Sequence, residues 1–178
     1  PIEGFADLWG HAIFQCPYCH GWEVQDRRWG VLLDPANAQM LVPFALMLRG
    51  WTQDLVVFKT QAFEVAQESI AQLQRAGVRV EAAPVQRLVG QDRTLQAVEL
   101  ATGDHVPCDV LFAHPPQRQV ALVQSLGLTL DDHGFVQVEA MKGETSVPGI
   151  FAGGDLTTRG QSAIFAASAA KSLPVYSQ

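Results

Sequence analysis

The sequence has no apolar run long enough to cross a membrane and no cluster of basic residues. Its longest nearly charge-free stretch, residues 38–48, is far shorter than the roughly 20 apolar residues of a membrane-spanning helix. The 12 lysine and arginine residues are scattered and are outnumbered by 18 aspartate and glutamate residues, which gives a net charge of −6. Nucleic acids and anionic membranes attract clustered positive charge. We therefore expect a cytoplasmic protein that binds neither.

Cysteine is also scarce, with three residues among 178. Three cysteines cannot cross-link a domain of this size, and two of them lie three positions apart in Cys16-Pro17-Tyr18-Cys19. The sulfurs of such a pair can close a small ring, and a helix that starts at the first cysteine stabilises its thiolate. The pair predicts two-electron redox chemistry. Cys108 fits no such pattern, and we expect it to be structural.

Other interpretations of the cysteine pair stay open at this point. Residues 16–20 also spell Cys-x-x-Cys-His, the attachment motif of c-type haem, although a covalent haem does not suit the surrounding α/β pattern. A zinc site would need a second close pair of ligands, and Cys108 with a distant histidine is a poor substitute. The pair also resembles the glutaredoxin motif, but the segment that would supply that family's downstream proline, residues 146–149, lies about 130 residues away. Two buried cysteines that are neighbours by chance are the last alternative.

Strands and helices alternate from residue 29 to residue 113. Helices are expected over residues 37–50 and 63–77, where apolar residues recur at helical spacing. After Pro84, alternating apolar residues predict a small antiparallel meander. Buried strands are expected at residues 29–33, 55–58, 78–81 and 110–113. This order is typical of a dinucleotide-binding α/β layer.

A second region follows Pro115 and Pro116. It is expected to contain a helix over residues 117–126, a hairpin around residues 131–134, a strand over residues 149–152 and a helix after Thr158.

The most specific motif is Thr-Ser-Val-Pro-Gly-Ile-Phe-Ala-Gly-Gly-Asp, residues 145–155. It resembles the C-terminal flavin-binding signature of the thioredoxin-reductase-like pyridine nucleotide–disulfide oxidoreductases. Small glycines let the backbone approach a cofactor closely, and the N-terminus of the following helix would point N–H groups at the flavin. The resemblance implies FAD as the cofactor, bound by Gly154, Asp155, Arg159, Gln161, Ser162 and Ala163. The small residues of the helix, Ala163, Ala166, Ala167 and Ala170, are expected to allow close packing.

The resemblance covers nearly the whole chain, and it is closest to the branch of the family that has a histidine after the second cysteine. It implies that Cys16 exchanges with the substrate and that Cys19 lies nearer the flavin. His20 would act as general acid or base, which suits an imidazole near neutral pH. No metal is implied. The implied partners are a small-molecule dithiol or disulfide or a thioredoxin-like protein, together with a second copy of the chain in a homodimer.

Two features depart from the family pattern. The turn after the first predicted strand, residues 34–38, contains no glycine and places Asp34 and Pro35 where backbone N–H groups should reach a pyrophosphate. Lys59 is the only basic residue at the end of the next strand, so binding of NAD(P)H is doubtful. The chain also lacks the Gly-x-Gly-x-x-Gly segment that cradles the FAD pyrophosphate in the family.

The expected fold is a three-layer, Rossmann-like FAD/NAD(P)-binding α/β domain with an antiparallel meander, followed by the C-terminal half of a second such domain. Residues 1–113 would be the NAD(P)-type domain that carries the redox pair, and residues 114–178 the C-terminal part of an FAD-binding domain whose N-terminal part is absent. The expected function is flavin-dependent disulfide/dithiol oxidoreduction through Cys16 and Cys19. An NADPH-dependent thioredoxin or disulfide reductase and a non-catalytic domain that folds without a cofactor are the alternatives.

Overall fold

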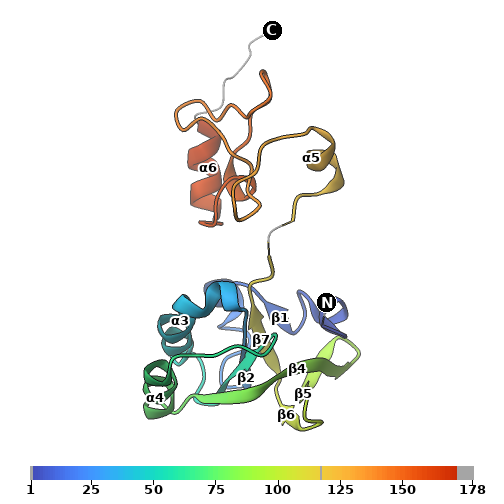
Figure 1. Cartoon of the computed structure of the whole chain (residues 1–178), viewed down its shortest axis with the longest axis vertical. Helices are drawn as coiled ribbons and strands as arrows, with labels where there is room; N and C mark the ends of the chain where they lie inside the picture. The colour runs from blue at the N-terminus through green and yellow to red at the C-terminus, as the bar shows by residue number, and fades with distance from the viewer. Residues whose placement is uncertain (1, 117, 172–178) are drawn as a thin grey trace. The chain divides into compact units, whose positions relative to one another are not determined.

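The computed structural model describes residues 2–116 and 118–171. The chain divides into two compact units, Pro1–His114 and Pro115–Gln178 (Figure 1). No helix within the described residues is both long and apolar enough to cross a membrane.

A mixed sheet forms the centre of the first unit. Its seven strands lie in the order β1-β7-β2-β3-β4-β5-β6. The first five of these pair in parallel, and β4, β5 and β6 form the antiparallel meander. The strands are β1 (Ile13–Phe14), β2 (Trp29–Leu33), β3 (Leu55–Lys59), β4 (Arg79–Gln91), β5 (Thr94–Leu100), β6 (His105–Pro107) and β7 (Val110–Ala113). The predicted α/β fold class is therefore confirmed.

The helices of this unit are shorter than predicted. They are α1 (Phe5–Leu8), α2 (Pro17–His20), the 3₁₀ helix η1 (Pro35–Met40), α3 (Leu41–Leu48) and α4 (Gln67–Arg75). The helix expected from residue 37 is split, because its first part adopts the tighter η1 turn. The helix expected from Phe63 begins four residues later, since Ala66 has an extended backbone with ψ of 132°.

The strand predicted at residues 78–81 and the first strand of the meander are one continuous strand, β4. Its first part pairs with β3 as far as Pro84, which lies opposite Lys59, and from Val85 onward it pairs with β5. Pro84 has no N–H to donate, but its carbonyl accepts a hydrogen bond from the N–H of Ala101 at 2.9 Å. A proline is tolerated where a strand changes partner because the ladder does not need its donor there. The expected break at Pro84 is thus a change of pairing.

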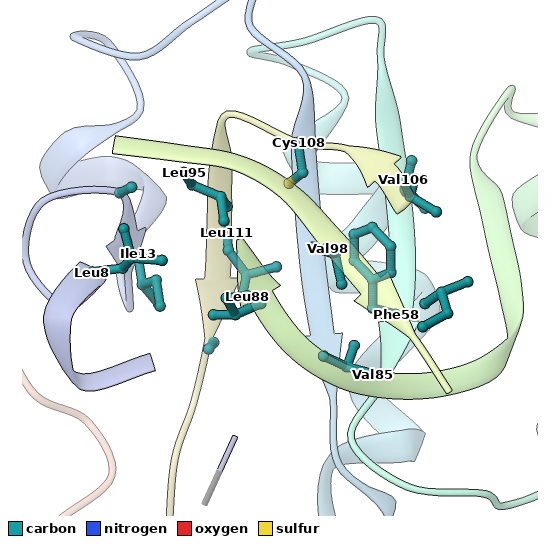
Figure 2. Close-up of a cluster of buried hydrophobic side chains, with 14 residues drawn as sticks. Leu8, Ile13, Phe58, Val85, Leu88, Leu95, Val98, Val106, Cys108 and Leu111 are labelled. Carbon is teal, nitrogen blue, oxygen red and sulfur yellow. The ribbon is translucent and has the colours of Figure 1, made fainter. Parts of the chain in front are cut away.

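The sheet separates two apolar cores. Successive side chains of a strand point to opposite faces, so Trp29, Val31 and Leu33 of β2 belong to the core that contains residues of α3 and α4. Figure 2 shows the other core, in which Phe58 of β3 and Leu111 of β7 pack with Val85, Leu88 and Val98 of the meander.

The second unit has little regular structure. It contains α5 (Ala121–Ser125), the 3₁₀ helix η2 (Gly154–Leu156) and α6 (Ala163–Lys171). The helix predicted over residues 117–126 is confined to α5, and Gln117 lies outside the described residues. The predicted hairpin is confirmed by the bridge between Leu130 and Val136. The strand predicted over residues 149–152 is wrong, because this segment forms only a single bridge, from Phe151 to Glu144.

Because Gly30 has no side chain, Phe58 and Leu111 in the core of Figure 2 can pack directly against the backbone of β2. A Cβ at this position would lie 2.7 Å from Cε2 of Phe58 and 2.8 Å from Cδ1 of Leu111. We expect Gly30→Ala to lower the free energy of unfolding by about 1–3 kcal/mol, as overpacking of a core does. Urea unfolding of the variant and the wild type would measure this difference in the free energy of unfolding.

Gly50→Ala is the matched control for this prediction. A Cβ at Gly50 would meet only the carbonyl oxygen of Met47, at 3.3 Å, so its effect should stay within about 0.5 kcal/mol. An unchanged or higher unfolding midpoint for Gly30→Ala would show that the core has room at this point.

Candidate functional site

Both cysteines of the predicted pair follow the short strand β1. This strand pairs with β7 and ends at Phe14, and Cys16 then precedes the four-residue helix α2. Pro17 is the first residue of α2, a position where the missing N–H is not needed and the fixed φ suits a helix. The pair therefore follows the carboxyl end of a parallel strand, and this is the edge at which open α/β sheets bind ligands.

The two sulfurs are in direct contact. Cys19 Sγ donates a hydrogen bond to Cys16 Sγ over 2.7 Å, and both thiols are free. This hydrogen bond, more than burial, raises the pKa of Cys19 above its ordinary value. Cys16 is half-buried and Cys19 is exposed. The sulfurs need to approach by well under 1 Å to reach the roughly 2.05 Å of a disulfide bond, and Cys16 Sγ is the acceptor of the hydrogen bond.

The ring of His20, the predicted acid or base, is stacked on Phe14. The ring centroids are 4.5 Å apart and the planes are 15° from parallel. In the described part of the chain no hydrogen bond joins the imidazole to Cys16 or Cys19. The structure thus places His20 directly after the pair, on its exposed side, and leaves its role in proton transfer a prediction.

Cys108 lies apart from the pair. It is 1% exposed within the core of Figure 2, and its thiol donates to the carbonyl of Val110 at 3.2 Å. Burial raises the pKa of Cys108 to about 12. These features fit the structural role expected from the sequence. Among residues 2–116 and 118–171, no three histidine, cysteine or acidic side chains converge as a metal site would require.

The predicted flavin-binding segment is built around two glycines that pack on α6. A Cβ on Gly153 would lie 3.1 Å from Cβ of Ala169, and a Cβ on Gly154 would lie 3.1 Å from Cβ of Ala166. Gly154 also has a φ of +70°, which favours glycine. The prediction of a small packing face was therefore right for Ala166 but missed Ala169. Ala163, Ala167 and Ala170 are exposed in this chain, and their packing role stays a prediction.

The six predicted cofactor residues lie within one short segment that ends at the start of α6. Gly154 and Asp155 lie in η2, and the Asp155 carboxylate is exposed. Ser162 caps α6, because its Oγ accepts the N–H of Phe165 at 3.2 Å. A backbone without Cβ atoms, an exposed carboxylate and a helix N-terminus suit a flavin nucleotide.

The other members of this segment are placed as follows. Gln161 precedes the cap, and Ala163 is the first residue of α6. The guanidinium of Arg159 lies 3.2 Å from Nδ1 of His133. Sequence reasoning missed this contact with His133, because no motif links the two residues.

The residues at the predicted nicotinamide site do not fit a pyrophosphate. Asp34 follows β2 and accepts a hydrogen bond from Oγ1 of Thr60 at 3.3 Å, so the ends of β2 and β3 are joined by their own side chains. The segment that should offer free N–H groups is η1, which begins with Pro35. Nζ of Lys59 donates to the carbonyl of Phe63 at 3.4 Å. The sequence did not indicate the role of Thr60.

Comparisons with known proteins agree with this architecture. The family model of the pyridine nucleotide-disulphide oxidoreductases matches residues 53–170. The thioredoxin reductase tcpT of Claviceps purpurea (strain 20.1) is 31% identical over 160 residues, which are 86% of this chain and 50% of that protein.

Solved structures with a similar fold also match most of this chain. The crystal structure of HlmI is 32% identical, with a TM-score of 0.74 over 96% of this chain and 52% of that one. The putative thioredoxin reductase TrxB of Bacillus anthracis is 27% identical, with a TM-score of 0.77 over 96% and 57%.

The chain spans about half the length of the curated relatives it matches. Within that span, the family model, the relatives and the sheet topology all agree. The chain therefore belongs to the pyridine nucleotide-disulphide oxidoreductase family, in its thioredoxin-reductase-like branch of flavin oxidoreductases.

Proposed function

We propose that this chain supplies the redox pair of a flavin-dependent disulfide/dithiol oxidoreductase. The observation that carries the proposal is the direct contact of the Cys16 and Cys19 thiols, 2.7 Å apart, on the turn that follows β1. A relative's name, thioredoxin reductase, indicates a disulfide substrate for that protein. For this chain the substrate is a small-molecule dithiol or disulfide, or a thioredoxin-like protein.

The exchange proceeds through Cys16. In the direction of dithiol oxidation, a substrate thiolate attacks Cys16 of the Cys16–Cys19 disulfide, and Cys19 leaves as a thiolate. The second substrate thiolate then attacks the substrate sulfur of this mixed disulfide, and Cys16 leaves. The substrate loses two electrons to the pair, and both cysteines end reduced. Disulfide reduction is the same sequence reversed.

FAD, when bound, takes up or supplies the two electrons of the pair. Gly154 and the N-terminus of α6 would approach it through backbone atoms, and Asp155 would accept hydrogen bonds from its hydroxyls. Arg159, Gln161, Ser162 and Ala163 complete the set. His20 holds or releases the proton that the exchanging thiols require. The first unit would then be the NAD(P)-type domain, the second the C-terminal part of the FAD domain, and the assembly a homodimer.

An NADPH-dependent disulfide reductase is the second candidate. It is favoured by the reductase names of the relatives. Against it stand the Asp34–Thr60 hydrogen bond and the absence of glycine between residues 34 and 38. A dithiol oxidase, or an enzyme with another electron donor, accounts better for these residues.

The order in which the thiols react tests their roles. Iodoacetamide should alkylate Cys16 before Cys19 in the reduced chain, because the hydrogen bond to Cys16 raises the pKa of Cys19 and so lowers its thiolate fraction, and only the thiolate reacts. Cys108 should react orders of magnitude more slowly, since it is buried and its pKa is about 12. Peptide mass spectrometry over time measures the order. Urea-unfolded protein, in which all three should react alike, is the control, and faster labelling of Cys19 would contradict the assignment.

Removal of either thiol should abolish turnover. In the FAD-loaded protein, Cys16→Ser and Cys19→Ser should each lose more than about 100-fold of the rate of dithiothreitol oxidation, because neither can close the intramolecular disulfide. Oxygen uptake measures this rate, and Cys108→Ala, outside the pair, should retain it. Normal turnover in both serine variants would refute the mechanism. A purified chain without flavin absorption bands would instead support a domain that folds without a cofactor.

The electron donor can be tested separately. NADPH mixed anaerobically with the FAD-loaded protein should bleach the flavin slowly or not at all, because the turn after β2 has no glycine and begins with Asp34, whose carboxylate would repel a phosphate, and Pro35, which has no N–H. Dithiothreitol, as the positive control, should bleach it. Rapid, saturable bleaching by NADPH would favour the reductase.

A further inference from the structure

The turn that carries the two thiols is too short to hold its own shape. Helix α2 has four residues and no side-chain hydrogen bond at its N-cap. One backbone hydrogen bond joins Cys19 N to Cys16 O at 3.2 Å, and another joins Gly21 N to Pro17 O at 2.6 Å. Isolated helices shorter than about 12 residues are marginal in water. Contacts from other parts of the unit must therefore fix the positions of the sulfurs.

The indole of Trp51, from the loop between α3 and β3, packs against α2. A Cβ on Gly21 would come within 2.9 Å of Nε1 and 3.0 Å of Cδ1 of Trp51, and still closer to the carbonyl oxygen of Pro17, so the turn lies close against the indole. The Tyr18 ring meets the same indole edge-on, with centroids 5.3 Å apart and planes at 85°. Residues 18 and 21 are three positions apart and lie on one side of a helical turn. Trp51 therefore covers that side of α2.

Trp51 is itself firmly held. Its backbone N–H donates to the carbonyl of Leu48 at 3.0 Å, and its backbone carbonyl accepts the N–H of Asp26 at 2.9 Å. Its ring stacks on Trp29, with centroids 6.4 Å apart. Trp29 is 1% exposed, and its own indole donates to the carbonyl of Val24 at 2.8 Å. Through Trp29, the indole of Trp51 is connected to the core that contains residues of α3 and α4.

Two further contacts complete the support of α2. The Tyr18 hydroxyl donates to Sδ of Met47 on α3 at 3.4 Å. At the end of the turn the His20 ring stacks on Phe14. Each of these contacts involves one residue of the turn, whereas Trp51 lies against both Tyr18 of α2 and Gly21, which follows α2.

We propose that Trp51 is a positioning residue that holds the turn of Cys16 and Cys19 in the geometry in which their thiols close a disulfide. This inference rests on the proposed redox role of the pair. Without the indole, the turn samples more conformations and one thiol spends less time beside the other. The effective concentration that favours the intramolecular disulfide then falls. A tenfold fall in the equilibrium constant corresponds to about 30 mV in the reduction potential.

The experiment equilibrates the chain with graded ratios of reduced and oxidised glutathione, traps the free thiols and counts them by mass spectrometry. Trp51→Ala should lower the equilibrium constant for disulfide formation about tenfold. Trp51→Phe, which keeps an aromatic ring in place, should stay within about twofold. Gly21→Ala should also lower this constant, because a Cβ there would meet Nε1 of Trp51 at 2.9 Å and the carbonyl oxygen of Pro17 still more closely, so the turn must shift.

A second readout and a matched control separate positioning from stability. Ultraviolet absorbance of the thiolates against pH should show the pKa of Cys19 returning toward its ordinary value in Trp51→Ala, since the hydrogen bond from Cys19 to Cys16 is lost. Trp9→Ala removes an indole that stacks on Phe5, away from α2, and should leave both readouts unchanged.

The proposal would be overturned if Trp51→Ala had the same equilibrium constant for disulfide formation and the same titration of Cys19 as the wild type, whatever the stability of the variant. If that variant does not fold, Trp51→Leu, which removes the indole but keeps an apolar side chain against the core, decides in the same way. If the wild-type pair forms no disulfide, the proposed redox function fails. The titration of Cys19 then tests the positioning role alone, and an unshifted curve in Trp51→Ala overturns it.

Discussion

The contact between the thiols of Cys16 and Cys19 depends on aromatic packing beneath a single helical turn. Such a turn has too few hydrogen bonds to be stable alone, and here rings from β2, from the loop before β3 and from β1 support it. Trp29 belongs to the core under the sheet, Trp51 stacks on it, and α2 rests on Trp51. The positions of the two thiols, which lie near the surface, therefore depend on the packing of the core beneath them.

The two units differ in how they suit a nucleotide. Near the start of α6, Gly153 and Gly154 bring the backbone close to a helix, and the exposed Asp155 follows them. At the ends of β2 and β3, in contrast, Asp34 and Thr60 use each other as hydrogen-bond partners. The first arrangement leaves backbone atoms and a carboxylate available, whereas the second places Asp34 and Pro35 where the family pattern has glycines. The family supports both flavin and nicotinamide cofactors, and the loss of the nicotinamide site in this chain is our proposal.

Much of the fold could be predicted from local patterns. The buried strands β2, β3 and β7 are continuous apolar runs, and Cys16 and Cys19, which the sequence places three positions apart, are in contact as expected. The two-residue strand β1 was missed, because it is held by its pairing with β7 rather than by its own composition. The support from Trp51 could not be predicted either, since it joins residues about 30 positions apart in the sequence. Long-range contacts of this kind leave no periodic signal.

The central claim is that Cys16 and Cys19 form a reversible disulfide within one chain. Peptide mapping by mass spectrometry, after mild oxidation of the reduced protein and again after treatment with dithiothreitol, tests it most directly. The account predicts the loss of two thiols, one peptide linkage between Cys16 and Cys19, full reversal by dithiothreitol and a free Cys108 throughout. A linkage that includes Cys108, a linkage between chains, or no loss of thiols would contradict it.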